Sequence, residues 1–79
     1  MTKKEKLIKK FLENPKSLKY SDIEKILLND GFYCDWGSKW SHKIITSEKT
    51  GKHQTIPIHN NDCKDKYKIK LIVFYLNNK

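Results

Sequence analysis

Arginine is absent from this sequence, and all 17 of its basic residues are lysines. Only nine acidic residues oppose them, so the formal net charge is +8 at pH 7 and the pI is near 9.5. A positive field of this size attracts polyanions. The composition therefore fits a nucleic acid or an acidic protein as partner. It fits a membrane surface less well, because no expected helix joins a lysine-rich face to a clearly exposed apolar face.

Long hydrophobic runs are lacking as well. The longest one, Leu71 to Leu76, is far too short to cross a bilayer, and the N-terminus has neither the apolar stretch nor the cleavage site of a signal peptide. We therefore expect a protein of the cytoplasm that makes no use of a membrane. With 79 residues, 37% of them hydrophobic, the chain has room for one small domain with a compact core, which we expect to cover residues 1–79.

Cysteine is scarce. Cys34 and Cys63 lie far apart in the sequence and neither belongs to a C-x-x-C pair, so we expect two reduced thiols, one or both partly buried. The three histidines and two cysteines never fall at the spacing of metal ligands. The sequence therefore predicts no metal site and no cofactor.

Two helices are predicted in the first thirty residues. Apolar residues form one stripe of a helix over 3–14, which Pro15 ends; they are Leu7, Ile8, Phe11 and Leu12. The lysines of this helix are interpreted as a solvated face. After a connector that ends at residue 20, Ser21 to Glu24 has the pattern of a capping box. Gly31 supplies the left-handed cap that ends this second helix.

Three strands and a last helix follow. Alternating and β-branched residues predict strands over 32–36, 40–46 and 54–59, with turns at Gly37-Ser38 and at residues 48–52. Gly51 takes the position that needs positive φ, and Pro57 indicates an edge strand. A helix is predicted from about Asp62 to Leu76. Its core-facing stripe is expected to contain Ile69, Ile72, Val73 and Leu76, widened by Leu71, Phe74 and Tyr75.

The order α-αβββα predicts an α+β fold of two layers, a three-stranded antiparallel sheet with helices packed on one face. Without the first helix, this is the arrangement of double-stranded-RNA-binding domains. Whether the first helix packs on the sheet, extends the surface of the last helix or mediates self-association stays open.

Groups that bind bases and phosphates concentrate between Trp36 and Asn60. All three histidines lie there, and the four lysines of this stretch face a single acid, Glu48. His42, which follows Lys39-Trp40-Ser41 and precedes Lys43, is the candidate catalytic residue. An imidazole titrates near neutral pH and can take a proton from a ribose 2′-OH, while ammonium groups hold the phosphate. The alternative is a surface histidine without a role.

The other two histidines allow more than one interpretation. His59 is a candidate second acid or base, or a phosphate contact at the start of the last helix. Alternatively, it closes the loop and caps that helix. His53, beside the hairpin turn, is taken as solvated.

Trp36 and Trp40 bracket the first turn. If they are exposed, their rings can stack on bases or anchor a protein partner. If they are buried, they belong to the core, and for Trp36 the core is the favoured interpretation. Trp40 alternates with His42, so the two are expected to share a face of the sheet.

Residues 21–76 resemble the HicA toxins, small mRNA interferases of bacterial toxin–antitoxin pairs. The matching features are the capped helix ending in Gly31-Phe32, the aromatic first strand, Ser41-His42, the Lys-Thr-Gly-Lys hairpin, the strand end Ile56-Pro57-Ile58-His59 and the closing amphipathic helix. Helix one and its connector resemble the N-terminal extension of one subgroup. The chain departs from the family pattern at Trp40, where a glycine is usual.

The resemblance implies a fold like that of double-stranded-RNA-binding domains and metal-independent cleavage of mRNA. It also implies that His42 is the catalytic residue and that a HicB-like antitoxin inhibits the toxin by covering this histidine. The residues expected to bind RNA around it are Lys39, Trp40, Ser41, Lys43 and His59. His42 and its neighbouring lysines are expected to project together from the outer, helix-free side of the sheet.

Three hypotheses therefore stand. The first is a ribonuclease toxin with His42 as general acid or base. The second is a module that grips structured RNA without cutting it. The third is a protein-interaction domain whose basic surface binds an acidic partner, anchored by Trp40. The oligomeric state does not follow from the sequence.

Overall fold

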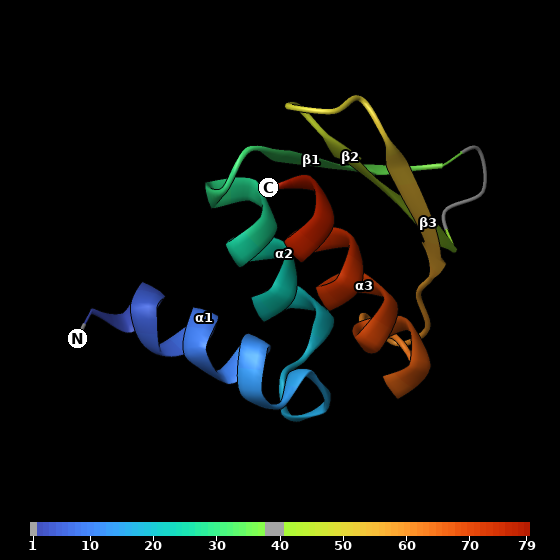
Figure 1. Cartoon of the computed structure of the whole chain (residues 1–79). Coiled ribbons are helices and arrows are strands. Elements are labelled where there is room, and N and C mark those ends of the chain that lie inside the picture. The colour runs from blue at the N-terminus through green and yellow to red at the C-terminus, as the bar shows by residue number, and fades with distance from the viewer. Residues whose placement is uncertain (1, 38–40) are drawn as a thin grey trace.

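A computed structural model describes residues 2–37 and 41–79, so the predicted turn at Ser38 and the predictions for Lys39 and Trp40 lie outside the described residues (Figure 1). The elements follow the predicted order α-αβββα. They are α1 (Lys3–Glu13), the short 3-10 helix η1 (Pro15–Ser17), α2 (Tyr20–Asn29), β1 (Phe32–Trp36), β2 (His42–Ser47), β3 (His53–Pro57) and α3 (Asp65–Asn78).

The three strands form one antiparallel sheet in the order β1-β2-β3. Pro57 therefore lies in an edge strand, and Gly51 has a φ of 72° in the β2–β3 hairpin, as the sequence predicts. The third strand is shorter than expected, because it ends at Pro57 and the chain turns after His59. Figure 1 shows the helices on one side of this sheet. This arrangement confirms the predicted α+β fold with helices on one face.

Alternation along the strands gives the sheet a helix-facing side and an outer side. Cys34, Ile45 and Ile56 lie on the helix-facing side, and the latter two are fully buried. Tyr33, Ile44 and His42 alternate with them and lie on the outer side. No described helix covers this outer side (Figure 1).

The start of α2 is capped from a distant part of the chain. The helix begins at Tyr20, its N-cap Lys19 makes no side-chain capping bond, and the predicted capping box at Ser21 is wrong. Instead, Asp62 Oδ1 accepts hydrogen bonds from the Tyr20 N–H at 2.9 Å and from the Cys63 N–H at 2.8 Å. A carboxylate at this position also stabilises the positive end of the helix dipole. The predicted cap at Gly31, with a φ of 86°, is confirmed.

The last helix begins three residues later than expected, at Asp65. Asn60 and Asn61 have positive φ values of 53° and 64°, and they form a tight turn between His59 and Asp62, which are bridged through their backbones. Two successive left-handed residues are typical of a two-residue hairpin turn, in which asparagine is favoured.

The predicted core stripe of α3 is confirmed for its widening residues Leu71, Phe74 and Tyr75 but is wrong for most of its central residues. Of the four central residues only Ile72 is buried, whereas Ile69, Val73 and Leu76 are 42%, 53% and 50% exposed. The face that packs against the rest of the protein carries Lys68, Leu71, Ile72, Phe74, Tyr75 and Asn78. Polar groups of this face are satisfied at the helix end, where the Ser47 hydroxyl donates to the Asn78 carbonyl at 2.7 Å.

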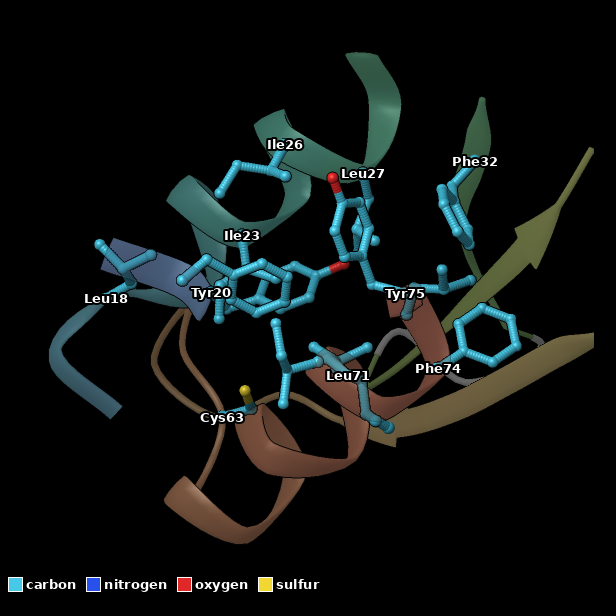
Figure 2. Close-up of a cluster of buried hydrophobic side chains, with 14 of the residues drawn as sticks. Leu18, Tyr20, Ile23, Ile26, Leu27, Phe32, Cys63, Leu71, Phe74 and Tyr75 are labelled. Carbon is cyan, nitrogen blue, oxygen red and sulfur yellow. The ribbon is translucent and has the colours of Figure 1, made fainter. Parts of the chain in front are cut away.

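The core lies between α2, α3 and the sheet, as Figure 2 shows. Phe32 and Tyr75 are both buried in it, with ring centroids 5.9 Å apart. Helix α1 contacts α2 and η1, and its buried Phe11 meets the Tyr75 ring edge-on at 5.5 Å. The first helix therefore packs on the other helices. Within the described part of the chain, each helix is too short or too polar to span a lipid bilayer.

Candidate functional site

His42 is the first residue of β2 and lies exposed on the outer side of the sheet. Its paired residue on the neighbouring strand β3 is Pro57, which offers an apolar edge and has no backbone N–H group. The Ser41 hydroxyl lies 3.0 Å from the imidazole Nδ1. A hydrogen bond at this nitrogen fixes the orientation of the ring and leaves Nε2 directed away from it. The side chain is thus presented to solvent by a strand of the sheet and by a local hydrogen bond.

Gly37 lies beside His42 on the β1 side. Its N–H donates to the His42 carbonyl at 2.9 Å, so the antiparallel pairing continues one residue beyond β1. A Cβ atom at this position would lie 3.9 Å from the His42 Cβ and 3.7 Å from Ile44 Cδ1, which are ordinary van der Waals contacts. The backbone there would accept a side chain, and such a side chain would stand next to the imidazole.

Lys43 does not share the outer face with His42, because consecutive strand residues point to opposite sides. Its ammonium lies 3.0 Å from Glu24 Oε1 of α2 and 4.5 Å from the centroid of the Trp36 ring. The expectation that Lys43 and His42 project together is therefore wrong. The Lys43 charge is used between the sheet and α2, while Lys39 lies outside the described residues.

Trp36 occupies the same helix-facing side at the end of β1. The expectation that it packs into the core is wrong, since 40% of the residue is exposed and its ring lies under the Lys43 ammonium. Cation–π contact and the ion pair with Glu24 together fix the position of Lys43. Sequence reasoning missed this contact of Lys43 with Glu24 and Trp36. The two partners are separated along the chain, and only the fold brings them to Lys43.

Two further polar groups, the Tyr20 phenol and the Cys34 thiol, lie next to this ion pair and stay protonated at neutral pH. The Tyr20 hydroxyl donates to Glu24 Oε1 at 3.2 Å, and burial, together with the nearby Cys34 and Glu24, raises the pKa of this phenol. Burial also raises the pKa of the Cys34 thiol to about 11. Because thiolate is the nucleophilic form of cysteine, Cys34 is an unreactive thiol at neutral pH. This cluster supports the strand that carries His42 and supplies no nucleophile.

His59 lies at the same end of the sheet as His42. The Ile58 N–H donates to the Ser41 carbonyl at 2.7 Å, so residue 59 lies two positions beyond Pro57, the partner of His42. His59 is exposed, and its backbone closes the turn to Asp62. His53, also exposed, pairs with Thr46 at the opposite end of the sheet. The fold thus brings His42 and His59 to one end and separates His53 from them.

The remaining candidate ligands do not converge. Cys34 and Cys63 are both free thiols, and burial raises the pKa of Cys63 to about 11. Within residues 2–37 and 41–79, no three side chains of histidine, cysteine, aspartate or glutamate gather in a way that could hold a metal ion.

Comparison with known protein families identifies relatives of this chain. The family model described as HicA toxin of bacterial toxin-antitoxin matches residues 20–73. The match begins at the first residue of α2 and ends within α3, so α1 and η1 precede it. Neither a curated protein nor a solved structure matches the chain.

Proposed function

Because this chain belongs to the HicA toxin family, we propose that it is an RNA-cleaving toxin, an mRNA interferase that uses His42 as general acid or base and needs no metal. The observation that carries this proposal is the exposure of the His42 imidazole on the side of the sheet that no described helix covers. A folded RNA substrate or a single strand can approach such a face without a change in the fold. RNA as substrate implies action in the cytoplasm.

The proposed chemistry uses the nucleophile that RNA itself carries. When the Nδ1–H of His42 donates to the Ser41 hydroxyl, Nε2 presents its lone pair and accepts the proton of a ribose 2′-OH. The 2′ oxygen then forms a bond to phosphorus as the bond to the 5′ oxygen breaks, which yields a 2′,3′-cyclic phosphate. Ser41 is in this account a positioning residue that orients the ring.

A second group must protonate the departing 5′ oxygen. His59 is the proposed acid, because the Ile58–Ser41 hydrogen bond brings it to the end of the sheet that carries His42. Lys39 and Trp40, which directly precede Ser41, remain proposed contacts to phosphate and base. Lys43 contributes instead by holding its strand against α2.

The family implies a cognate antitoxin. We propose that it is HicB-like and that it inhibits the toxin by covering His42, since an exposed imidazole is the simplest group to block. A neighbouring gene that encodes a HicB-like protein would support this pairing, and its product would be the protein to purify with the toxin.

The decisive substitution is His42→Ala. We expect it to lower the RNA cleavage rate by at least about 10²-fold, the usual contribution of a general acid or base, and to abolish growth arrest. Because the residue is exposed, the free energy of unfolding should change by less than about 0.5 kcal/mol. His53→Ala, an exposed histidine at the opposite end of the sheet, is the matched control and should cleave like the wild type.

Cleavage is measured with purified protein and a labelled RNA in the presence of EDTA, followed by analysis of the product ends. Unchanged cleavage by His42→Ala would reject the catalytic assignment. A wild-type protein that binds RNA tightly and leaves it intact would favour the binding module instead. Loss of cleavage on addition of EDTA would show that the reaction needs a metal.

A further inference from the structure

An open groove separates α3 from the edge strand β3. It has a volume of about 430 Å³, and its lining residues are Gln54, Ile69, Lys70, Val73, Phe74, Asn77 and Asn78. Ile69 and Val73 are about half exposed although they are large and apolar. The groove therefore includes two of the three α3 residues that periodicity assigns to the core and the fold leaves at the surface.

The strand beside this groove has one side without a strand partner in the described sheet. At its two ends, the Ser47 N–H donates to the Lys52 carbonyl and the Ile58 N–H donates to the Ser41 carbonyl. In an antiparallel ladder every second residue bonds to the same neighbour, so Gln54 and Ile56 also point their backbone groups toward β2. The backbone groups of His53 and Thr55, and the carbonyl of Pro57, consequently point toward the outer edge.

Such an edge next to a helix fits an extended peptide. Strand addition supplies main-chain hydrogen bonds, and pockets for alternate side chains supply specificity. Here the edge offers the N–H groups of His53 and Thr55 and ends at Pro57, which has none. The groove beside it offers Ile69 and Val73 to the apolar side chains of an added strand.

Charge decides which kind of partner fits. The groove lining contains Lys70 and no carboxylate, and the protein carries a net charge of +8. A second copy of this chain would bring the same positive charge and be repelled. An RNA strand would set phosphates against apolar side chains. An acidic protein segment with alternating apolar residues matches both the apolar side chains that line the groove and the positive charge of the protein.

We infer that an extended acidic segment of the cognate antitoxin adds to β3 as a fourth strand and places its apolar side chains in the groove against α3. The inference rests on the proposed function for the identity of the partner. The groove lies on the helix-facing side and His42 lies on the outer side, so the antitoxin holds the toxin at a second place and reaches the imidazole around the β3 edge.

Hydrogen exchange tests the strand addition directly. In the toxin alone, the amides of His53 and Thr55 should exchange rapidly, while those of Gln54 and Ile56 are protected. In the complex with the purified product of a neighbouring antitoxin gene, His53 and Thr55 should become protected by at least about tenfold. An unchanged exchange rate at both residues in a saturated complex would overturn the inference.

Substitution tests the groove. Val73→Glu places a carboxylate in the groove and should raise the Kd for the antitoxin at least about tenfold. Its matched control is Leu28→Glu on α2, because Leu28 is equally exposed at 54%; it should bind like the wild type. Val73→Ala keeps the test valid if the glutamate variant unfolds, and should weaken binding to a smaller degree.

RNA cleavage in the absence of antitoxin separates this inference from the proposed function. Val73→Glu should cleave RNA like the wild type while binding antitoxin weakly. Equal antitoxin affinity in Val73→Glu and the wild type would overturn the inference and leave the cleavage proposal intact. Absence of cleavage by the wild type would remove the proposed function. The exchange and affinity measurements would still decide whether an antitoxin segment binds in the groove.

Discussion

Lys43 shows at the scale of a single residue how a cation beside a catalytic candidate can serve the fold. Its ammonium is paired with Glu24 in a partly buried position, with side-chain exposures of 13% and 24%. Lys43→Met removes the charge and leaves Glu24 without its ion-pair partner, while the Tyr20 hydroxyl still donates to it. We expect the free energy of unfolding to fall by about 1–2 kcal/mol, measured by urea denaturation, while RNA cleavage at a temperature where the variant is folded stays within about threefold of the wild type.

Lys49→Met is the control, since this exposed lysine in the hairpin turn should leave both stability and cleavage unchanged. A variant Lys43→Met that keeps its stability and loses cleavage would mean that the ammonium contacts RNA after all. Glu24→Gln should reproduce the loss of stability, because it removes the other half of the same pair.

Gly37 has a separate consequence for access to His42. Gly37→Leu is expected to fold, because a Cβ at this position meets only van der Waals contacts at 3.6 Å or more, and to place its branched end beside the imidazole. We expect KM for a short RNA to rise at least about tenfold with little change in kcat. Gly37→Ala, which adds one methyl group, should retain most of the activity.

Thr46→Leu adds similar bulk to the outer face four residues from His42 and should leave KM unchanged. Steady-state kinetics on the three variants and thermal denaturation check the expectation together. Equal KM values for Gly37→Leu and the wild type would show that substrate approaches from another direction.

The sequence identifies His42 and His59 as candidates because imidazole chemistry does not depend on the fold. It does not determine which of His42 and Lys43 faces outward, since the following residues Ile44 and Ile45 are both apolar and alternation fits either choice. Only the complete burial of Ile45 decides it. The role of Ser41 and the RNA contacts of Lys39 and Trp40 stay predictions.

At the scale of elements, Asp62 links the turn before α3 to the start of α2. Asp62→Ala removes the acceptor for the N–H groups of Tyr20 and Cys63, and we expect a loss of about 1 kcal/mol in the free energy of unfolding, as for other N-terminal caps. Asp35→Asn, an exposed carboxylate on the outer side of the sheet, is the control and should change stability by less than about 0.5 kcal/mol.

The same carboxylate predicts a pH dependence. Its partial burial by itself acts to raise the pKa of Asp62, but the N–H groups of Tyr20 and Cys63 and the nearby Lys68 ammonium outweigh it and lower the pKa. A folded-state pKa below the unfolded value of about 3.9 means that the ionised carboxylate stabilises the fold above about pH 4. This stabilisation is lost as the pH falls through the folded-state pKa.

Urea denaturation of the wild type and Asp62→Asn checks this sign. The wild type should be the more stable protein at pH 7, and the difference should shrink as the pH is lowered below about 4. A difference that stays constant down to pH 2 would show that the charge of Asp62 does not contribute.

Elements with one apolar stripe or a clear turn residue were predictable from the sequence, whereas an element with several possible apolar faces was not. Helix α1 has a single stripe around Phe11, and Gly31 and Gly51 mark positive φ, so their positions follow from local rules. From Ile69 to Leu76, α3 is apolar nearly all round, so periodicity alone cannot choose the buried face. Tyr75 determines the choice through tertiary contacts, because its ring meets Phe11 and Phe32 and its hydroxyl donates to Asp30.

At the scale of the whole molecule, positive charge is spread far beyond the candidate site. The lysines of α1 are exposed, and the helix lies on the far side of α2 and α3 from the outer face of the sheet (Figure 1). They can therefore attract RNA through the long-range field without touching the scissile phosphate. Under the proposed function, we expect the α1 extension to contribute to encounter with RNA and the residues matched by the family model to contribute to the chemistry.

Replacing Lys6, Lys9 and Lys10 by glutamine tests this division, because it lowers the net charge from +8 to +5 without changing the sheet. We expect the association rate with RNA to fall several-fold at low salt and to approach that of the wild type as rising ionic strength screens the field. The cleavage rate at saturating RNA should stay within about twofold, measured by stopped-flow binding and single-turnover cleavage. A fall in the saturated rate would place these lysines in contact with the reacting RNA, and would require the bound strand to pass around the helices to α1.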